Sequence, residues 1–235
     1  MASIPRNFDT RFAYHIYNCG VEKRSIFTSV DDYGKFKEIV TFYKHLKPIK
    51  LSYYNRLTAK EREIYIRNYP PSKELERIKI IAYCLMPNHF HLMIRTVSKY
   101  NPSEFVSDIQ NSYTKYFNIK NERMGSLFQG RFKSRRIDSN ASVINLSRYI
   151  HLNPVKSSKT NKNNNPNILD SYPHSSYKTW ALSSSSGFLD TDELDSWISL
   201  AGGRQKYKEF VTAGISLTEK IDRGIEKTKL EKSMD

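Results

Sequence analysis

The sequence has only two cysteines, Cys19 and Cys84, and no CxxC pair among its 235 residues. Two isolated cysteines exclude the disulfide framework of a small secreted protein and a cysteine-based zinc site. No run of about 18 apolar residues is present, so no membrane-spanning helix is expected. The first residues also lack the apolar stretch of a signal peptide. These absences predict a cytoplasmic protein without a membrane partner.

Acidic residues are few beside the basic ones, 24 against 38, and the formal net charge is +14. A chain this basic usually binds a polyanion, although a basic surface can also serve solubility alone. Residues 115–136 hold one acid, Glu122, with interleaved aromatic residues. Cations that hold phosphates, beside rings that can stack on bases, suit single-stranded nucleic acid. The predicted DNA-binding residues are Lys115, Lys120, Arg123, Arg131, Lys133, Arg135 and Arg136.

Hydrophobic periodicity predicts an ordered series of strands and helices. An antiparallel sheet covered by helices, an α+β fold, fits this order. Ser103 is the expected N-cap of one helix, and Pro154 is expected to stop another. The predicted elements are a strand at 11–18, a helix at 30–46, a hairpin of strands at 78–85 and 89–96, a helix at 103–118, an extended segment at 127–137 and a helix at 141–153.

Composition also divides the chain into parts. Residues 1–158 are predicted to form one domain, 159–167 a linker or loop rich in asparagine, and 168–235 a C-terminal extension. Within the domain, the polar, tyrosine-rich stretch 47–76 is predicted to be an insert, with a short helix around 59–68.

The segment MPNHFHLMI, residues 86–94, places two histidines on either side of one bulky apolar residue. On a strand, residues two apart point to the same face, so His89 and His91 would present two imidazoles together. Phe90, Leu92 and Ile94 would then face the other way. Two adjacent imidazoles are half of a divalent-metal site. The same pattern also fits two unrelated histidines on a half-buried strand.

A second set of polar residues lies in SRYIHLNPVK, residues 147–156. Tyr149 and Asn153 are four residues apart, so they share one face of a helix, and His151 points away from Tyr149 to the surface or to the C-terminal tail. A phenol with its ordinary pKa of about 10 becomes a useful nucleophile toward a phosphodiester when a cation neutralises the phosphate. Asn153 could supply an oxygen ligand to that cation. Tyr149 could also be an ordinary core aromatic.

Together these segments resemble the single-tyrosine branch of the HUH transposases, in particular the REP-associated tyrosine transposases and other IS200-like proteins. MPNHFHLMI resembles the histidine–hydrophobic–histidine motif, and RYIHLNPVK resembles the tyrosine segment. Further similar segments occur in the same order, and the resemblance spans roughly residues 11–180. They are YHI at 14–16, RSIF at 24–27, SYTKYFN at 112–118, LFQGRF at 127–132 and YPHSSY at 172–177.

The resemblance implies a ferredoxin-like sheet with packed helices and a catalytic domain at 1–158. It also implies that His89, His91 and Asn153 hold Mg²⁺ or Mn²⁺ and that Tyr149 is the nucleophile. The expected activity is cleavage of single-stranded DNA beside a hairpin, through a 5′-phosphotyrosine intermediate. A nucleoid-associated protein that acts as a monomer or a homodimer would fit this activity.

Other assignments stay open on the sequence alone. Tyr113 and Tyr116 are rival nucleophiles, because their predicted helix is basic and could lie near DNA. The protein could instead be a domesticated DNA-hairpin-binding protein that mobilises nothing, or a metal-dependent nuclease that hydrolyses its substrate without a protein–DNA adduct.

Overall fold

A four-stranded antiparallel sheet with the order β2-β3-β1-β4 forms the centre of the molecule. This computed structural model describes residues 8–70, 72–97, 101–157, 167–184 and 187–222. Helix α1 lies in the connection from β1 to β2, which also contains the short helices of the 47–76 insert, and α4 connects β3 to β4. A β-α-β-β-α-β chain with this strand order is the ferredoxin-like arrangement, so the predicted α+β fold is confirmed. The strands are β1 (Ala13–Cys19), β2 (Ile78–Met86), β3 (His89–Thr96) and β4 (Lys133–Ile137).

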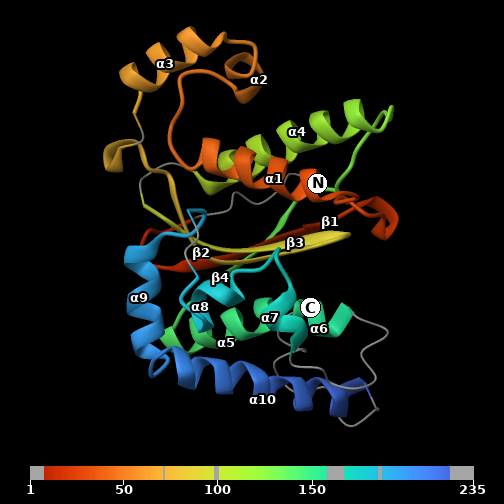
Figure 1. The fold of residues 1–235 in the computed structure, drawn as a ribbon, viewed down its shortest axis with the longest axis vertical. Coiled ribbons are helices and arrows are strands. Elements are labelled where there is room, and N and C mark those ends of the chain that lie inside the picture. Colours follow the sequence, from red (N-terminus) through yellow and green to blue (C-terminus); the bar gives the residue numbers. More distant parts are fainter. Residues whose placement is uncertain (1–7, 71, 98–100, 158–166, 185–186, 223–235) are drawn as a thin grey trace.

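Helices cover both faces of the sheet (Figure 1). Helices α1 and α4 pack together over one face, while α5 to α8 lie over the other, with α10 beyond them. None of the described helices is long and apolar enough to cross a membrane. The main helices are α1 (Val30–Tyr43), α4 (Pro102–Lys120), α5 (Asn140–His151), α9 (Thr191–Leu200) and α10 (Arg204–Asp222), and the shorter α-helices are α2 (Leu51–Tyr54), α3 (Ala59–Asn68), α6 (Asn153–Ser157), α7 (Asn167–Ser171) and α8 (Tyr177–Ala181).

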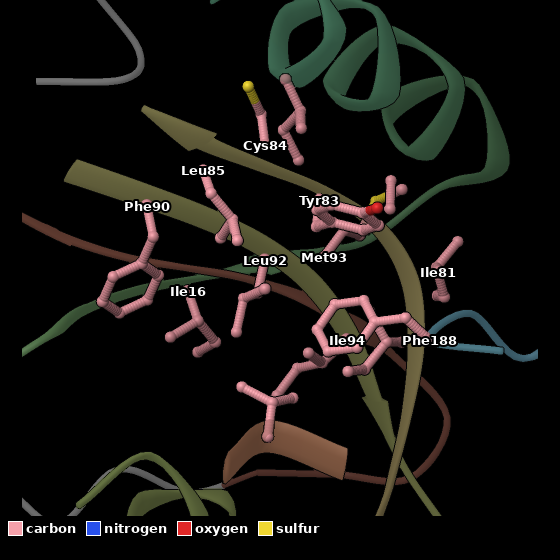
Figure 2. Close-up of a cluster of buried hydrophobic side chains, with 14 of the residues drawn as sticks. Ile16, Ile81, Tyr83, Cys84, Leu85, Phe90, Leu92, Met93, Ile94 and Phe188 are labelled. Carbon is pink, nitrogen blue, oxygen red and sulfur yellow. The ribbon is translucent and has the colours of Figure 1, made fainter. Parts of the chain in front are cut away.

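Strand β3 separates two environments, as its alternating sequence predicted. Phe90 packs against Phe36 of α1, with ring centroids 5.3 Å apart, and Leu92 and Ile94 project from the same side of the strand (Figure 2). His91 projects from the other side, toward α5. The apolar face is buried completely, and this anchors the strand so that its polar residues are held in fixed positions on the opposite face.

The insert at 47–76 contains α2, α3 and a single 3₁₀ turn (Lys73–Leu75), and the predicted helix at 59–68 is confirmed. Thr58 and Glu61 explain why α3 begins where it does. The Thr58 hydroxyl accepts a hydrogen bond from the Glu61 N–H at 3.3 Å, and the Glu61 carboxylate accepts one from the Thr58 N–H at 2.7 Å. This reciprocal pair satisfies two N–H groups that the first turn of the helix would otherwise leave unpaired.

Helix α4 begins at Pro102, and Asn101 caps it instead of the predicted Ser103. The Asn101 side chain accepts a hydrogen bond from the Ser103 N–H at 2.8 Å. Proline suits the first helical position because its missing N–H would have no partner there. The choice of cap was therefore wrong by two residues, although the predicted helix is present.

The segment predicted as extended at 127–137 is regular only in its second half. Phe128 forms one isolated bridge to Gly20, and β4 begins at Lys133. Between them Gly130 has a φ of +62°, a conformation that favours glycine. The chain therefore turns before it enters the sheet beside β1.

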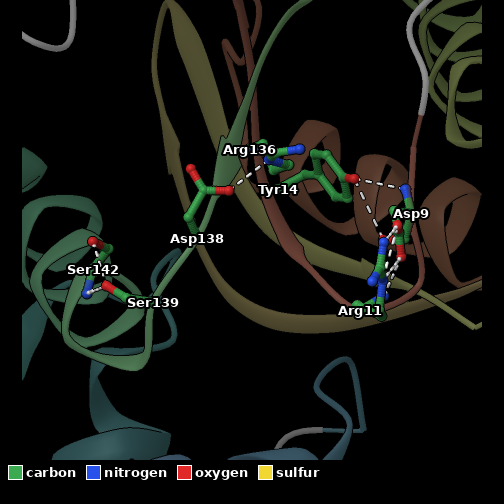
Figure 3. A network of polar contacts seen from close by, with 7 residues as sticks. All are labelled: Asp9, Arg11, Tyr14, Arg136, Asp138, Ser139 and Ser142. Atoms are coloured by element: carbon green, nitrogen blue, oxygen red, sulfur yellow. Dashed lines mark hydrogen bonds and ion pairs between the residues drawn. The ribbon is translucent and has the colours of Figure 1, made fainter.

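The predicted helix at 141–153 is two helices with a break between them. Ser139 caps α5 by accepting a hydrogen bond from the Ser142 N–H at 3.2 Å (Figure 3). Helix α5 ends at His151, and α6 begins at Asn153, followed by Pro154. Proline has no N–H to donate, so the hydrogen-bond ladder of α5 cannot continue through it. Asn153, just after this break, is buried at the C-terminal end of α5.

The C-terminal extension packs into the same hydrophobic core as the sheet. The predicted linker at 159–167 lies outside the described residues, except for its last residue. Further on, residues 174–176 run beside β2: the Leu85 N–H donates to the His174 carbonyl at 2.9 Å, and the Ser176 N–H donates to the Tyr83 carbonyl at 3.0 Å. The extension therefore continues the hydrogen bonding of the sheet past its β2 edge.

Candidate active site

The two histidines of β3 and the tyrosine of α5 line one cavity of about 510 Å³. The His89 and His91 rings have centroids 5.0 Å apart and are nearly perpendicular. Their position on one strand face matches the spacing that the sequence showed. The cavity is lined by Tyr17, Asn18, Cys19, His89, Phe90, His91, Gln129, Lys133, Tyr149 and Asn153.

Each of these two histidines has one ring nitrogen held by a neighbouring side chain. The Nδ1 atom of His89 lies 2.7 Å from the Asn88 Oδ1 atom. The Nδ1 atom of His91 lies 2.8 Å from the Nε2 atom of His15, on β1. In metal-binding histidines the non-ligating nitrogen is typically held in this way, which fixes the orientation of the ring. The remaining ligand candidate on each ring is therefore Nε2.

Asn153 places an amide oxygen beside these imidazoles. Its Nδ2 group donates to the carbonyls of Tyr149 at 3.0 Å and Ile150 at 3.2 Å. Because an N–H must face those carbonyls, the Oδ1 atom is turned the other way, and it lies 3.4 Å from the His89 Nε2 atom. The two histidines and Asn153 are thus brought together as predicted, with nitrogen and oxygen atoms that could serve one cation.

The Tyr149 ring meets the His91 ring edge-on, with centroids 5.7 Å apart and an interplanar angle of 84°. Lys156, on α6, places its Nζ atom 4.5 Å from the centroid of the same tyrosine ring. Tyr149 is half-buried, so one side packs on the core while the ring still lines the cavity. An anionic group in the cavity would therefore meet the phenol and the histidines together, and Lys133 also lines this cavity.

Burial keeps the site histidines neutral. It lowers the pKa of His89. It also lowers the pKa of His91 well below its ordinary value, and the nearby His15, His89 and Lys156 lower it further. Burial also lowers the pKa of His15 to about 3. A neutral imidazole carries the lone pair that a metal ion needs, so the histidines are in the binding form near neutral pH.

Within the described ranges, no three or more His, Cys, Asp or Glu side chains converge in a way that could hold a metal ion. A cation here would instead bind two imidazole nitrogens and the Asn153 oxygen, with open positions for other ligands. The ordered Nδ1 contacts of both histidines fit such a site, because they direct the two Nε2 atoms without occupying them.

The rival tyrosines of α4 lie on the other face of the sheet. Tyr113 is buried, and its hydroxyl donates to the Ile26 carbonyl at 2.5 Å. Tyr116 donates to the Asp32 carboxylate at 3.0 Å. Helix α4 covers the sheet face opposite α5 (Figure 1). Both hydroxyls are therefore separated from the histidine cavity by the sheet.

A different tyrosine, Tyr17, was missed by sequence reasoning although it shares the cavity. It is directly opposite His91 in the β1–β3 register, and the two ring centroids are 5.8 Å apart. Lys133 lies above its ring at 5.8 Å. The strand pattern of YHIYN indicated that residues 15 and 17 share a face, but nothing in it located that face beside His91.

The predicted basic cluster is divided between the two faces of the molecule. Lys133 and Arg135 of β4 are opposite Tyr17 and His15 in the β1–β4 register, so they share the face that carries the histidines. Lys133 also lines the cavity. Lys156 was not in the predicted set, yet it belongs with these two. These three residues, Lys133, Arg135 and Lys156, are called the site-face cations below.

The other predicted cations are elsewhere, and two of them, Lys120 and Arg136, are paired with acids. Lys115, Lys120 and Arg123 belong to α4 or the turn after it, on the opposite face. The Lys120 ammonium lies 2.6 Å from the Asp32 carboxylate. Although burial raises the pKa of Asp32, the hydrogen bonds from Lys120, Thr28 and Tyr116 outweigh it and lower the pKa to about 2.

Arg136 has the next position on β4 and faces away from the cavity. It pairs with Asp138 at 2.5 Å (Figure 3). Its guanidinium also lies over the Phe12 ring, 4.6 Å from the centroid. Arg131, which is exposed, lies in the loop before β4. The seven basic residues that are close together in the sequence therefore do not all lie on one face of the molecule.

Part of the chain matches a known protein family. Residues 54–153, which include β2, β3, α4, β4 and α5, match the model of the IS200-like transposase family. Over this stretch, which is less than half of the chain, the sequence is similar to IS200-like transposases. No curated protein matches the chain. The transposase segment ends at Asn153, so it contains His89, His91 and Tyr149, but His15 and Tyr17 lie before it.

Solved structures extend the likeness beyond the transposase segment. A REP-associated tyrosine transposase bound to a REP hairpin has a TM-score of 0.52 and 14% identity, and the match covers 81% of this chain and 94% of that one. At this identity the match shows the fold, which it shares over most of its length. A protein assigned as a transposase from Deinococcus radiodurans R1 has a TM-score of 0.34 and 12% identity, with 63% and 95% covered. That second likeness is too low to support a conclusion.

His151 does not belong to the cavity. Its Nδ1 atom lies 2.7 Å from the Tyr207 hydroxyl on α10, and its Nε2 atom lies 2.7 Å from the Ser176 hydroxyl. It is fully buried, so of the two predicted positions, surface or tail contact, the tail contact is the correct one. Through His151 the C-terminal extension is tied to the helix that carries Tyr149.

Proposed function

We propose that this protein is a transposase that cleaves single-stranded DNA with Tyr149 as nucleophile and rejoins it by strand transfer. The observation that carries the proposal is that Tyr149, two neutral imidazoles and the Asn153 oxygen line one cavity. A hydrolytic nuclease would need an activated water but not the phenol. A hairpin-binding protein would need neither the imidazoles nor the phenol.

In the proposed reaction the Tyr149 phenol oxygen attacks the phosphorus of a phosphodiester. The bond from phosphorus to the 3′ oxygen breaks, and the products are a 5′-phosphotyrosine ester and a free 3′-hydroxyl. Because the ester conserves the energy of the broken bond, a second 3′-hydroxyl can attack it and restore the strand without a nucleotide cofactor. The phenol needs help, since it is largely protonated near neutral pH.

His89, His91 and Asn153 would hold Mg²⁺ or Mn²⁺ at the cavity. When bound, such an ion supplies positive charge to the phosphate oxygens and orients the bond that breaks. The protein contributes the placement: β3 fixes the two imidazoles, and the break between α5 and α6 turns the Asn153 oxygen toward them. The site-face cations would hold the flanking phosphates.

The proposed DNA partner is a single strand next to a hairpin. The REP-associated tyrosine transposase with the similar fold was solved with a REP hairpin, which supports this choice.

The test is incubation with a labelled hairpin oligonucleotide from the DNA that flanks the gene, with Mn²⁺, followed by denaturing electrophoresis. We expect a covalent protein–DNA band that EDTA abolishes, and mass mapping should place the link at Tyr149. Cut DNA without an adduct would indicate a hydrolytic nuclease. Binding with neither cut nor adduct, across several flanking hairpins, would indicate a DNA-binding protein.

Charge removal should separate the two faces of the molecule. We expect the double variant Lys133→Gln/Arg135→Gln to weaken binding of the hairpin oligonucleotide about 10- to 100-fold at moderate salt, because two phosphate contacts are lost. It should also reduce the slope of log affinity against log salt concentration by about 2. Fluorescence anisotropy across a salt series measures both quantities.

The matched control is Lys115→Gln/Arg136→Gln, which removes the same charge from positions outside the cavity face. This variant should bind nearly as tightly as the wild type. Equal losses for both pairs would mean that the DNA does not choose the cavity face, and a loss for the control alone would place the interface outside the cavity face.

A further inference from the structure

His15 makes the one polar contact that the Nδ1 atom of His91 has among the described residues. The two side chains come from adjacent strands, with the His15 Nε2 atom 2.8 Å from the His91 Nδ1 atom. Their rings are stacked with centroids 5.0 Å apart and an interplanar angle of 22°. His15 is 2% exposed, so water has little access to this contact.

Only one proton can lie between two neutral imidazole nitrogens that share a hydrogen bond. A neutral imidazole has one N–H and one lone pair, and which nitrogen carries the proton depends on its surroundings. If His91 offers the lone pair of Nε2 to the cavity, its proton must be on Nδ1. That N–H must then donate to the lone pair on the His15 Nε2 atom, which requires His15 to carry its own proton on Nδ1.

We propose that His15 is a positioning residue that holds His91 in the Nδ1–H tautomer, with its Nε2 lone pair directed into the cavity. This role for His15 rests on the proposed function, because the direction of the His91 lone pair matters only if a cation binds in the cavity. The tautomer itself is a property of the metal-free protein and can be measured separately.

His15 is not a third ligand in this arrangement. It is absent from the residues that line the cavity, and its Nε2 atom is already directed at His91. Tyr17 stacks on it with ring centroids 4.6 Å apart, and the Tyr149 ring meets it edge-on at 6.1 Å. His15 therefore lies behind both the histidine and the phenol, where it can fix positions without reaching substrate.

An apolar residue would satisfy this buried position better if packing were its only role. Burying a polar ring is unfavourable unless it gains hydrogen bonds, and a phenylalanine would fill a similar volume without that requirement. By contrast, a partner that orients a metal-binding histidine typically accounts for a 10- to 100-fold change in metal affinity. The buried pair is better explained by orientation than by packing.

The test uses two variants of the full chain, His15→Gln and His15→Phe. Glutamine can place its Oε1 atom as an acceptor near the position of the His15 Nε2 atom, whereas phenylalanine keeps the ring but accepts nothing. Long-range ¹H–¹⁵N correlation spectra of the metal-free protein report the tautomer of His91. We expect Nδ1–H in the wild type and in His15→Gln, and a shift toward Nε2–H in His15→Phe.

Mn²⁺ affinity, measured from the free-ion signal in electron paramagnetic resonance, gives the second readout. We expect about a 10- to 100-fold loss in His15→Phe and at most a few-fold loss in His15→Gln. An Nε2–H tautomer in the wild-type spectrum would overturn the inference, and this reading needs no variant to fold. So would a His15→Phe protein that folds and keeps both the tautomer and the affinity.

The two proposals fail in different ways. If the wild type binds Mn²⁺ no better than a His91→Ala control, the proposed metal chemistry is wrong, while the tautomer still decides the role of His15. If Mn²⁺ binding depends on His91 but not on His15, the proposed function stands and the inference about His15 is wrong.

Discussion

Replacing Tyr149 with phenylalanine is expected to abolish the covalent protein–DNA adduct. The change removes one oxygen atom and leaves the ring that packs against His91, so the fold and the cavity are retained. Without the phenol oxygen no phosphotyrosine ester can form, and adduct yield should fall at least about a thousandfold. Hairpin affinity should change little, because the site-face cations remain. Denaturing gels with labelled DNA measure the adduct, and anisotropy measures the affinity.

Tyr17→Phe is the matched control, because Tyr17 lines the same cavity and its ring is at a similar distance from His91. It should still form the adduct. The reverse pattern, with adduct lost in Tyr17→Phe and kept in Tyr149→Phe, would assign the nucleophile to β1. Adduct that survives in both variants would require a tyrosine outside the cavity and would end the proposed mechanism.

Replacing Trp180 with alanine is expected to destabilise the whole protein by about 3–5 kcal/mol. Trp180 is fully buried, its indole N–H donates to the Ile81 carbonyl at 3.0 Å, and its ring packs on Tyr207 with centroids 4.8 Å apart. Truncation would leave a large cavity and an unpaired carbonyl on β2. Urea unfolding followed by circular dichroism measures the loss.

The control for Trp180→Ala is Leu182→Ala. Leu182 lies less than one helical turn after Trp180 in the chain, and this residue is 42% exposed. It should change the unfolding free energy by no more than about 0.5 kcal/mol. A loss below about 1 kcal/mol for Trp180→Ala would show that α8 contributes little to the core. A large loss means that the extension after residue 168 is part of the same cooperative unit as the sheet.

The elements of the fold were predictable because their signals are local. Alternation located β1 and β3, an apolar run located β2, and helical spacing located α1 and α4. Two errors arose where more than one residue could define a helix end. Asn101 caps α4 in place of Ser103. The last predicted helix is divided in two just before Pro154. A proline after Asn153 was visible in the sequence, but the resumption of a helix beyond it was not.

The site was predictable only in the parts that one segment carries. His89 and His91 are two apart on a strand, and Tyr149 and Asn153 are four apart at a helix end, so each pair was fixed by local geometry. His15 and Tyr17 were not recognised as site residues because they reach the cavity through the β1–β3 register. A register between strands more than seventy residues apart leaves no periodic trace in the sequence.

The basic cluster shows the same limit for charge. Residues 115–136 are consecutive, yet they run along α4 over one face and return through β4 to the other. Asp32 neutralises Lys120 from 88 positions away in the chain. Counting charges along a segment therefore overstated how many of these cations share one face of the molecule.

The backbone that runs beside β2 has a protective consequence. Strand β2 is a nine-residue, almost wholly buried strand, and its outer edge would otherwise expose unpaired N–H and C=O groups to any other chain. Residues 174–176 occupy that edge with the chain's own peptide groups. A ribosome releases β2 long before it completes this cover, so the nascent chain has an unpaired strand edge during that interval. Premature termination in between would yield a fragment prone to aggregation.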